Sequence, residues 1–120
     1  MSDTDIHVTA MRYSKDSKAL SVTFDDGFSY DLPTEYMRVY SPSAEVRGHG
    51  ADERKIIAGR RHVGIMKIEP VGNYAVRIVF DDGHDTGIFS WSYLRELGEA
   101  KGTKWAAYLK ELADKGLERD

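Results

Sequence analysis

The stretch FDDGHDTGIFSWSYLREL, residues 80–97, decides how this chain folds. Asp82-Gly83 is the kind of pair that best tolerates the positive φ of a tight hairpin turn. Ser90 is a good helix N-cap, and Gly98, just beyond the stretch, suits the left-handed residue that ends a helix. The stretch therefore predicts a two-residue hairpin turn, a return strand and a short helix, in that order.

An earlier stretch, FDDGFSYDLPTEYMRVYS at residues 24–41, repeats this plan. Apolar residues alternate with polar ones before it and continue after its Asp26-Gly27 turn, which indicates two half-buried strands. Pro33 then ends the second strand and suits the first turn of a helix. The chain thus contains two hairpin-plus-helix units 56 residues apart. An internal duplication is compatible with this spacing, but the two stretches share little beyond FDDG and do not prove one.

The remaining segments complete an α+β domain. Residues 6–13, 63–69 and 74–80 alternate as strands do. The C-terminal segment 103–116 predicts a helix, capped by Thr103 and ended by Gly116, with its apolar residues on one face. We therefore predict one domain over residues 1–120, built of antiparallel β-hairpins packed with short helices in two layers, plus a C-terminal α-helix.

Composition excludes several classes of function. The 120 residues carry a formal net charge of −3, whereas a dedicated nucleic-acid-binding domain is usually basic. No apolar run is long enough to span a bilayer, and the N-terminus lacks the basic and apolar regions of a signal peptide. Zero cysteines exclude disulfides, thiolate nucleophiles and cysteine-bound metals. We expect a cytoplasmic protein with no cofactor, no membrane contact and no nucleic-acid partner.

Residues 45–62, EVRGHGADERKIIAGRRH, form a basic segment in an otherwise acidic chain. The segment has three glycines and no periodicity, and connections of this length are often functional. One interpretation is a partner-binding loop that uses Arg47, His49, Arg60 and Arg61. The other is a solvated connection, because basic residues are common in glycine-rich loops.

Two groups of residues invite a chemical role, and each also has a structural explanation. His84 and its neighbouring aspartates offer a metal ligand or a general base, but the same residues fit a cross-strand pair of His84 with Asp81 at the hairpin turn. Trp91, Tyr93 and Trp105 offer a binding platform, but aromatics at helical spacing usually belong to a core.

The segment VGNYAVRIVFDDGHDTGIFSWSYLREL resembles the signature of the gamma-butyrobetaine hydroxylase-like N-terminal domain family. The signature is a strand, then D-G-H, a glycine and an aromatic-rich helix. The resemblance covers roughly residues 5–98, with residues 103–116 as a helical extension. The matching positions are Asp82, Gly83, His84, Gly87, Trp91, Tyr93, Leu94 and Arg95.

The resemblance has two implications for metal chemistry. In carnitine-pathway dioxygenases this domain precedes the catalytic barrel and binds zinc through three cysteines and the histidine that His84 matches. The corresponding stretch here, MRVYSPSAEVRG, offers Tyr40, Pro42 and Ser43 but no thiol. We therefore expect no zinc site, and no enzyme activity because the catalytic domain is missing.

The resemblance also implies a partner. Family members occur alone in bacteria, and fused to P-loop ATPases that carry iron–sulfur clusters. It thus favours a non-enzymatic accessory domain that binds a protein, with a P-loop iron–sulfur carrier as the candidate. The alternative is a small metal-binding or catalytic domain centred on His84.

Overall fold

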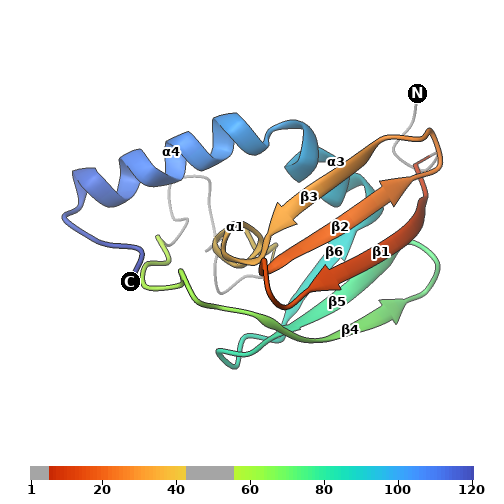
Figure 1. Cartoon of the computed structure of the whole chain (residues 1–120), viewed down its shortest axis with the longest axis horizontal. Coiled ribbons are helices and arrows are strands. Elements are labelled where there is room, and N and C mark those ends of the chain that lie inside the picture. Colours follow the sequence, from red (N-terminus) through yellow and green to blue (C-terminus); the bar gives the residue numbers. More distant parts are fainter. Residues whose placement is uncertain (1–5, 43–55) are drawn as a thin grey trace.

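The computed structural model describes residues 6–42 and 56–120, and these form an α+β domain (Figure 1). Two three-stranded antiparallel sheets, ordered β1-β2-β3 and β4-β5-β6, pack with three helices, which confirms the predicted fold class. No helix of the described ranges is long and apolar enough to cross a membrane. The elements are β1 Val8–Ser14, β2 Ala19–Phe24, β3 Ser29–Pro33, α1 Thr34–Val39, β4 Ile65–Val71, β5 Ala75–Phe80, β6 Gly87–Ser90, α3 Trp91–Glu99 and α4 Lys101–Asp114.

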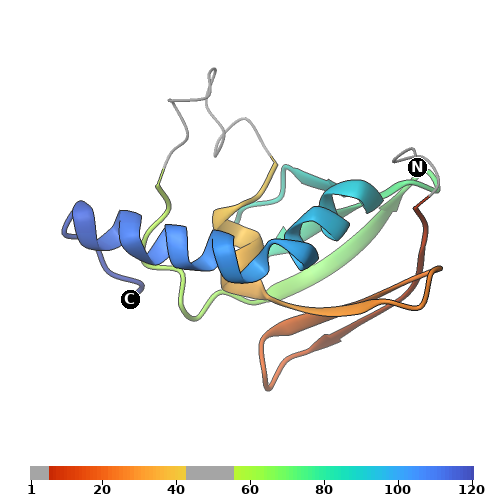
Figure 2. The same cartoon turned by 90° about the horizontal axis from the view of Figure 1, so that it is seen from above.

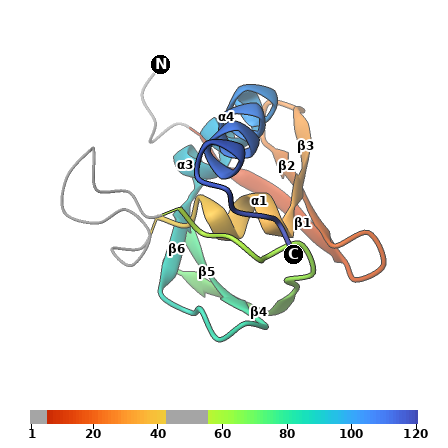
Figure 3. The same ribbon diagram turned by 90° about the vertical axis from the view of Figure 1, so that its left-hand side faces the viewer.

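One core joins both sheets to α1 and α3. Viewed end-on, the sheets diverge on either side of α1, while α3 and α4 lie above it (Figure 3). The alternation of β2 places three apolar side chains inward as predicted. The alternation of β5 also holds, except that the strand begins one residue later than expected and leaves Tyr74 exposed. The fully buried core residues of these strands and helices include Leu20, Val22, Phe24, Leu32, Tyr36, Met37, Ile78, Phe80, Phe89, Leu94 and Leu97.

The two D-D-G turns have the same geometry. In each, the residue before the turn donates its N–H to the residue after it, Phe24 to Phe28 and Phe80 to His84, both at 2.9 Å. Each loop therefore holds three residues, and the predicted two-residue turn is wrong. The third loop residue is the glycine, with φ of +91° in the first loop and +93° in the second. A three-residue loop that ends in a left-handed glycine is the next commonest hairpin connection.

The helix ends differ from the sequence prediction in two places. Ser90 caps α3 as expected, since its side chain accepts the N–H of Tyr93 at 3.1 Å. Gly98, however, lies inside α3, and a Cβ at this position would lie 2.5 Å from the ring of Tyr30. Gly98 is therefore needed for close packing rather than for ending the helix. Figure 2 shows α3 leading into α4, which extends beyond the sheets. Because α4 begins at Lys101, Thr103 lies inside the helix, and the prediction that Thr103 caps it is wrong.

Gly116 ends the C-terminal helix as the sequence predicts. It has a φ of +68°, and its N–H donates to Ala113 O at 3.2 Å. The next residue, Leu117, donates its N–H to Leu112 O at 2.8 Å. Together these bonds satisfy carbonyls in the last turn of α4, which is the Schellman arrangement.

Residues 6–42 (the first half) and 63–99 (the second half) contact each other through pairs of matching interactions. Tyr36 of α1 donates its hydroxyl to Leu97 O at 2.7 Å, near the end of α3. Tyr93 of α3, 57 positions after Tyr36, donates its hydroxyl to Tyr40 O at the end of α1. Each helix is thus held at its C-terminal end by a tyrosine of the other helix. The two halves therefore make equivalent contacts with each other.

The C-terminal residues fold back on α1. The buried carboxylate of Glu35 accepts from Arg119 Nε at 3.0 Å and from Arg119 Nη2 at 2.7 Å. This hydrogen bond raises the pKa of Arg119, whose guanidinium also lies 5.2 Å from the ring centroid of Trp105. Backbone bonds from Gly59 and Arg61 hold the same C-terminal segment. The last residues of the chain are therefore part of the packed structure.

Candidate functional site

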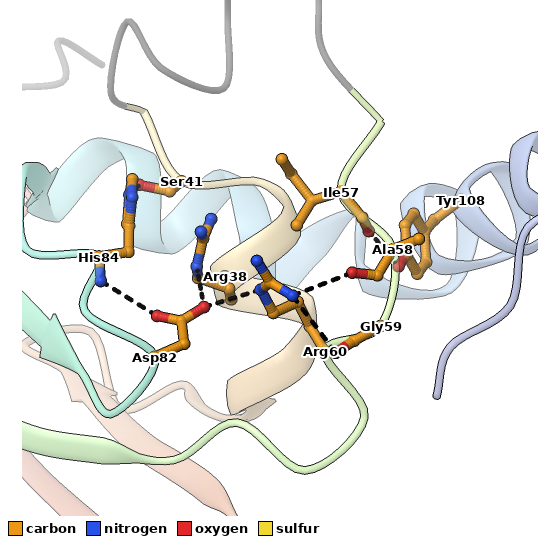
Figure 4. Close-up of polar contacts among 9 residues, drawn as sticks. All are labelled: Arg38, Ser41, Ile57, Ala58, Gly59, Arg60, Asp82, His84 and Tyr108. Atoms are coloured by element: carbon orange, nitrogen blue, oxygen red, sulfur yellow. Dashed lines mark hydrogen bonds and ion pairs between the residues drawn. The ribbon is translucent and has the colours of Figure 1, made fainter.

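The D-G-H element lies in the loop between β5 and β6, and the end of α1 packs against this loop (Figure 4). We take the loop and the end of α1 as the candidate site. Asp82 and Gly83 belong to the three-residue turn, and His84 follows it. Arg38 and Ser41 approach from α1 and the residues that follow it, whereas Arg60 approaches from the segment that leads into β4.

Asp82 lies between two arginines. Arg38 Nε donates to Asp82 Oδ2 at 2.8 Å, and the Nε of Arg60 lies 2.8 Å from the same oxygen. The Arg60 contact brings opposite charges together without hydrogen-bond alignment, since Arg60 Nε is buried and makes no hydrogen bond. Burial raises the pKa of Asp82, but the His84 N–H, the Arg38 hydrogen bond and the two positive charges outweigh it. The pKa of this carboxylate is therefore held below its ordinary value.

His84 is buried, with 5% of its surface exposed. Its Nε2 lies 2.9 Å from Ser41 Oγ, and its backbone N–H donates to Asp82 Oδ1 at 3.1 Å. The imidazole also packs near the ring of Phe80, with 5.9 Å between the ring centroids. The expected cross-strand pairing of His84 with Asp81 is thus wrong, because the imidazole turns inward to Ser41 instead of lying along the hairpin.

The contact between His84 and Ser41 requires a glycine at position 87. A Cβ at Gly87 would overlap Ser41 Oγ, so any larger residue in the signature would push Ser41 away from His84. The glycine of the signature therefore allows the hydroxyl to approach the imidazole.

The remaining signature residues hold α3 to the rest of the domain. Trp91 Nε1 donates to Asn73 O at 2.8 Å, and Leu94 is fully buried. Arg95 binds Asp26 in the first hairpin turn, with 2.9 Å between Nη2 and Oδ2. The hydrogen bonds that Arg95 donates to Asp26 and then to Glu99 raise the pKa of Arg95. Trp91, Tyr93 and Trp105, the suggested aromatic platform, are partly buried and pack against the core.

The arginines and histidine of the basic segment are found in different surroundings. Arg47 and His49 lie outside the described residues. Arg60 binds Asp82 as described above, whereas Arg61 Nε lies 2.9 Å from Asp120 Oδ1 in an exposed ion pair. A cavity of about 330 Å³ opens beside Arg60. It is lined by Gly59, Arg60, His62, Val63, Asp81, Asp82 and Asp120.

The zinc ion that the resemblance implies for this domain does not fit the residues that the structure describes around His84. Zinc sites in proteins use thiolates, imidazoles and carboxylates, and a neutral serine hydroxyl is a poor substitute. His84 faces the Ser41 hydroxyl, and the nearby carboxylate of Asp82 is held by two arginines. No group of three His, Asp or Glu side chains in residues 6–42 and 56–120 is arranged to hold a metal.

Sequence reasoning missed Arg38 and Ser41 as parts of this site. The signal that could have identified Arg38 was the parallel between the two units, because Y-M-R at 36–38 corresponds to Y-L-R at 93–95. Ser41 lies between Tyr40 and Pro42, in the stretch that corresponds to the zinc-binding cysteines of the dioxygenases. Its importance depends on the fold bringing it to His84, 43 residues away.

The sequence and fold of this chain are similar to those of known proteins. The model of the family described as gamma-butyrobetaine hydroxylase-like, N-terminal, matches residues 11–95. A protein solved by NMR is 47% identical, with a TM-score of 0.82 over 95% of this chain and 90% of its own. A second NMR structure is 43% identical, with a TM-score of 0.82 over 94% of this chain and 84% of its own.

A crystal structure from Acidithiobacillus ferrooxidans is also similar. That protein has unknown function and belongs to the DUF971 family. It is 37% identical, with a TM-score of 0.65 over 77% of this chain and 92% of its own. No curated protein matches this chain.

Proposed function

The chain belongs to the gamma-butyrobetaine hydroxylase-like N-terminal domain family, and from that premise we propose that it is a non-enzymatic accessory domain that binds a protein partner. The candidate partner is a P-loop ATPase that carries an iron–sulfur cluster, and the proposed location is the cytoplasm. The proposal rests on what the family signature does in this chain.

The signature residues bind to the domain itself. Asp82 is held by arginines, His84 by Ser41, and Arg95 by Asp26 and Glu99. A catalytic group must instead reach a reacting atom from a pocket, with a pKa suited to proton transfer. These side chains hold the hairpins to the helices. The family signature therefore reflects residues that stabilise the fold. This observation favours a function located on the surface of the domain.

Electrostatics favours the basic segment as the contact surface. The chain has a net charge of −3, yet Arg47, Arg60 and Arg61 lie close together in sequence. Arg61 is 45% exposed, and its ion pair with the exposed Asp120 is of the kind that contributes little to stability. A partner with an acidic surface would be drawn to this segment first, because long-range attraction raises the rate of encounter.

The test measures binding of the full chain to a purified P-loop iron–sulfur carrier by isothermal titration calorimetry, at low and at high salt. We expect saturable binding that weakens as salt rises. The double change Arg47→Ala with Arg61→Ala should weaken binding, whereas Lys110→Ala on α4 should not, since it removes an exposed charge elsewhere. Arg60 is left unchanged because of its contact with Asp82. No binding at low salt, or equal loss in both variants, would contradict the proposal.

The alternative centred on His84 has its own test. Zinc is titrated into the untagged chain and into His84→Ala. We expect both to bind zinc no better than a surface histidine does. A stoichiometric site tighter than about 1 μM that is lost in His84→Ala would favour the metal-binding function instead.

A further inference from the structure

Arg38 and its counterpart Arg95 differ in the number of carboxylates that surround them. Arg95 Nε donates to Glu99 Oε2 at 2.9 Å, and Arg95 Nη1 donates to Asp26 Oδ1 at 3.0 Å. One guanidinium thus meets two carboxylates. In the other half, Arg38 and Arg60 share the single carboxylate of Asp82. Within the part of the chain that the structure describes, the group formed by Arg38, Arg60 and Asp82 therefore carries one net positive charge.

One nitrogen of the Arg38 guanidinium lacks a hydrogen-bond partner. Arg38 is 7% exposed, and its Nη1 is buried and makes no hydrogen bond. A buried donor without a partner costs free energy, and the cost is larger when the group is charged. Arg60 Nε, on the other side of Asp82, is likewise buried and makes no hydrogen bond. Arg60 Nη1 already donates to Ala58 O and Gly59 O, at 3.2 and 3.4 Å, so the capacity for another acceptor lies at Arg38 Nη1 and Arg60 Nε.

The matching half shows which acceptor is missing. Glu99 is four residues after Arg95 and lies in the same helix, because α3 continues to Glu99. The residue four positions after Arg38 is Pro42, and α1 ends at Val39. The first half therefore cannot supply the second carboxylate from its own helix.

We propose that Arg38 and Arg60 form a binding site for one carboxylate group, which takes the place that Glu99 occupies in the other half. Guanidinium groups bind carboxylates with two parallel hydrogen bonds, and such charge-assisted bonds are roughly twice as strong as neutral ones. The carboxylate belongs to an acidic side chain of a partner protein or to a free organic acid, and both present the same chemistry.

The site is reached from the side of Arg60. Its side chain is 35% exposed, and it lines the cavity of about 330 Å³ together with Asp82. The acidic residues of that cavity are Asp81, Asp82 and Asp120. Asp82 is neutralised by the two arginines and Asp120 by Arg61, and His62 lies 3.6 Å from Asp120. An entering carboxylate therefore meets the Arg60 guanidinium beside two carboxylates that are already paired, and Asp81 is the third carboxylate of the lining.

The test is an NMR titration of the full chain that follows the side-chain Nε–H signal of Arg38 and the amides of Asp82 and His84. The probes are sodium acetate, a short glutamate-rich peptide, sodium phosphate and sodium chloride, at matched ionic strength. We expect acetate to produce saturable shifts at these groups. Saturation by the peptide at lower concentration would assign the carboxylate to a partner protein, and equal carboxylate affinities would assign it to a free acid.

Variants decide whether Arg38 is responsible. Arg38→Lys keeps the charge but removes the paired donors, and we expect acetate to bind about tenfold more weakly. Arg95→Lys is the matched control and should leave acetate binding unchanged, because Arg95 already has its two carboxylates. If Arg38→Lys does not fold, Arg60→Lys replaces it, since the more exposed Arg60 is easier to substitute.

Three results would overturn the proposal. The first is the absence of saturable shifts with acetate. The second is equal acetate affinity in Arg38→Lys or Arg60→Lys and in the parent chain. The third is an equal response to chloride, which would mean an adventitious ion only.

Discussion

Arg38 Nε lies 2.8 Å from Asp82 Oδ2, although 44 residues separate the two in the chain. The same relationship recurs between Arg95 and Asp26, where the helix of the second half binds the turn of the first. Each aspartate belongs to a D-D-G turn, and each arginine to the helix of the opposite half. The two halves are thus joined by a reciprocal pair of arginine–aspartate contacts.

Replacing Arg95 by alanine should lower the free energy of unfolding by about 1–2 kcal/mol. The guanidinium lies over the rings of Phe24, Phe28 and Tyr30, at 5.1–5.6 Å from their centroids, so packing is lost together with charge. Urea denaturation measures the change. Lys110→Ala, which breaks an exposed i,i+4 pair, should cost under about 0.5 kcal/mol. Equal effects would mean that the contacts of Arg95 contribute little.

Alanine at Gly98 should destabilise the domain even though alanine favours helices by about 1 kcal/mol over glycine. The new Cβ would lie 2.5 Å from the ring of Tyr30, which must then move. Gly102 in α4 is the matched control, because no atom lies within 4 Å of its added Cβ. Gly102→Ala should therefore leave stability unchanged or raise it. Thermal melts of both variants test this prediction. A Gly98→Ala variant as stable as the parent would show that the Tyr30 side chain moves at little energetic cost.

Alanine at Gly27 or Gly83 should destabilise by about 1 kcal/mol or more, through backbone strain alone. Both glycines have strongly positive φ, and an added Cβ at either would meet no atom within 4 Å. Asparagine tolerates this backbone region better than alanine, so Gly27→Asn should lose less stability than Gly27→Ala. Chemical denaturation distinguishes these variants. Equal losses for asparagine and alanine would indicate a cause other than φ.

Removing the Arg119 side chain should cost about 2 kcal/mol, because the buried carboxylate of Glu35 would lose its paired cation. Arg61→Ala is the control, since its exposed pair with Asp120 should contribute under about 0.5 kcal/mol. Glu35→Gln combined with Arg119→Gln should recover part of the loss by removing both charges. Urea denaturation measures the free energy of unfolding of all three variants. Similar losses for Arg119→Ala and Arg61→Ala would show that water hydrates the Glu35 carboxylate in place of Arg119.

The contribution of Asp82 should depend on pH. Its pKa in the folded protein is lowered from the ordinary value of 3.8, so the folded state favours the ionised carboxylate. The stabilisation is present above pH 3.8 and is lost as pH falls through the lower folded-state pKa. Asp82→Asn should thus differ most from the parent near neutral pH and converge with it in acid. Asp114→Asn, at an exposed position, should show a smaller difference, and denaturation curves across pH test both.

The sequence predicts most local structure here because local structure depends on neighbours in the chain. The alternation around Val22 and Ile78, the serine at position 90 and the glycine at position 116 act over a few residues, and each gives the expected element. The length of the D-D-G turns was harder to predict, since an Asp-Gly pair suits both two-residue and three-residue loops. Hydrogen bonding across the strand pair selects the longer one.

What the sequence determined by itself was the order of strands and helices, the positions of the two turns, and the absence of cysteine ligands for a metal. What only the tertiary structure decided was the partner of each polar group. His84 meets Ser41, Asp82 meets Arg38, and Gly98 meets Tyr30, in each case across dozens of residues. Periodicity records which face of an element is buried, but it carries no information about which other element lies against that face. Those long-range pairings arise only when the two halves pack together.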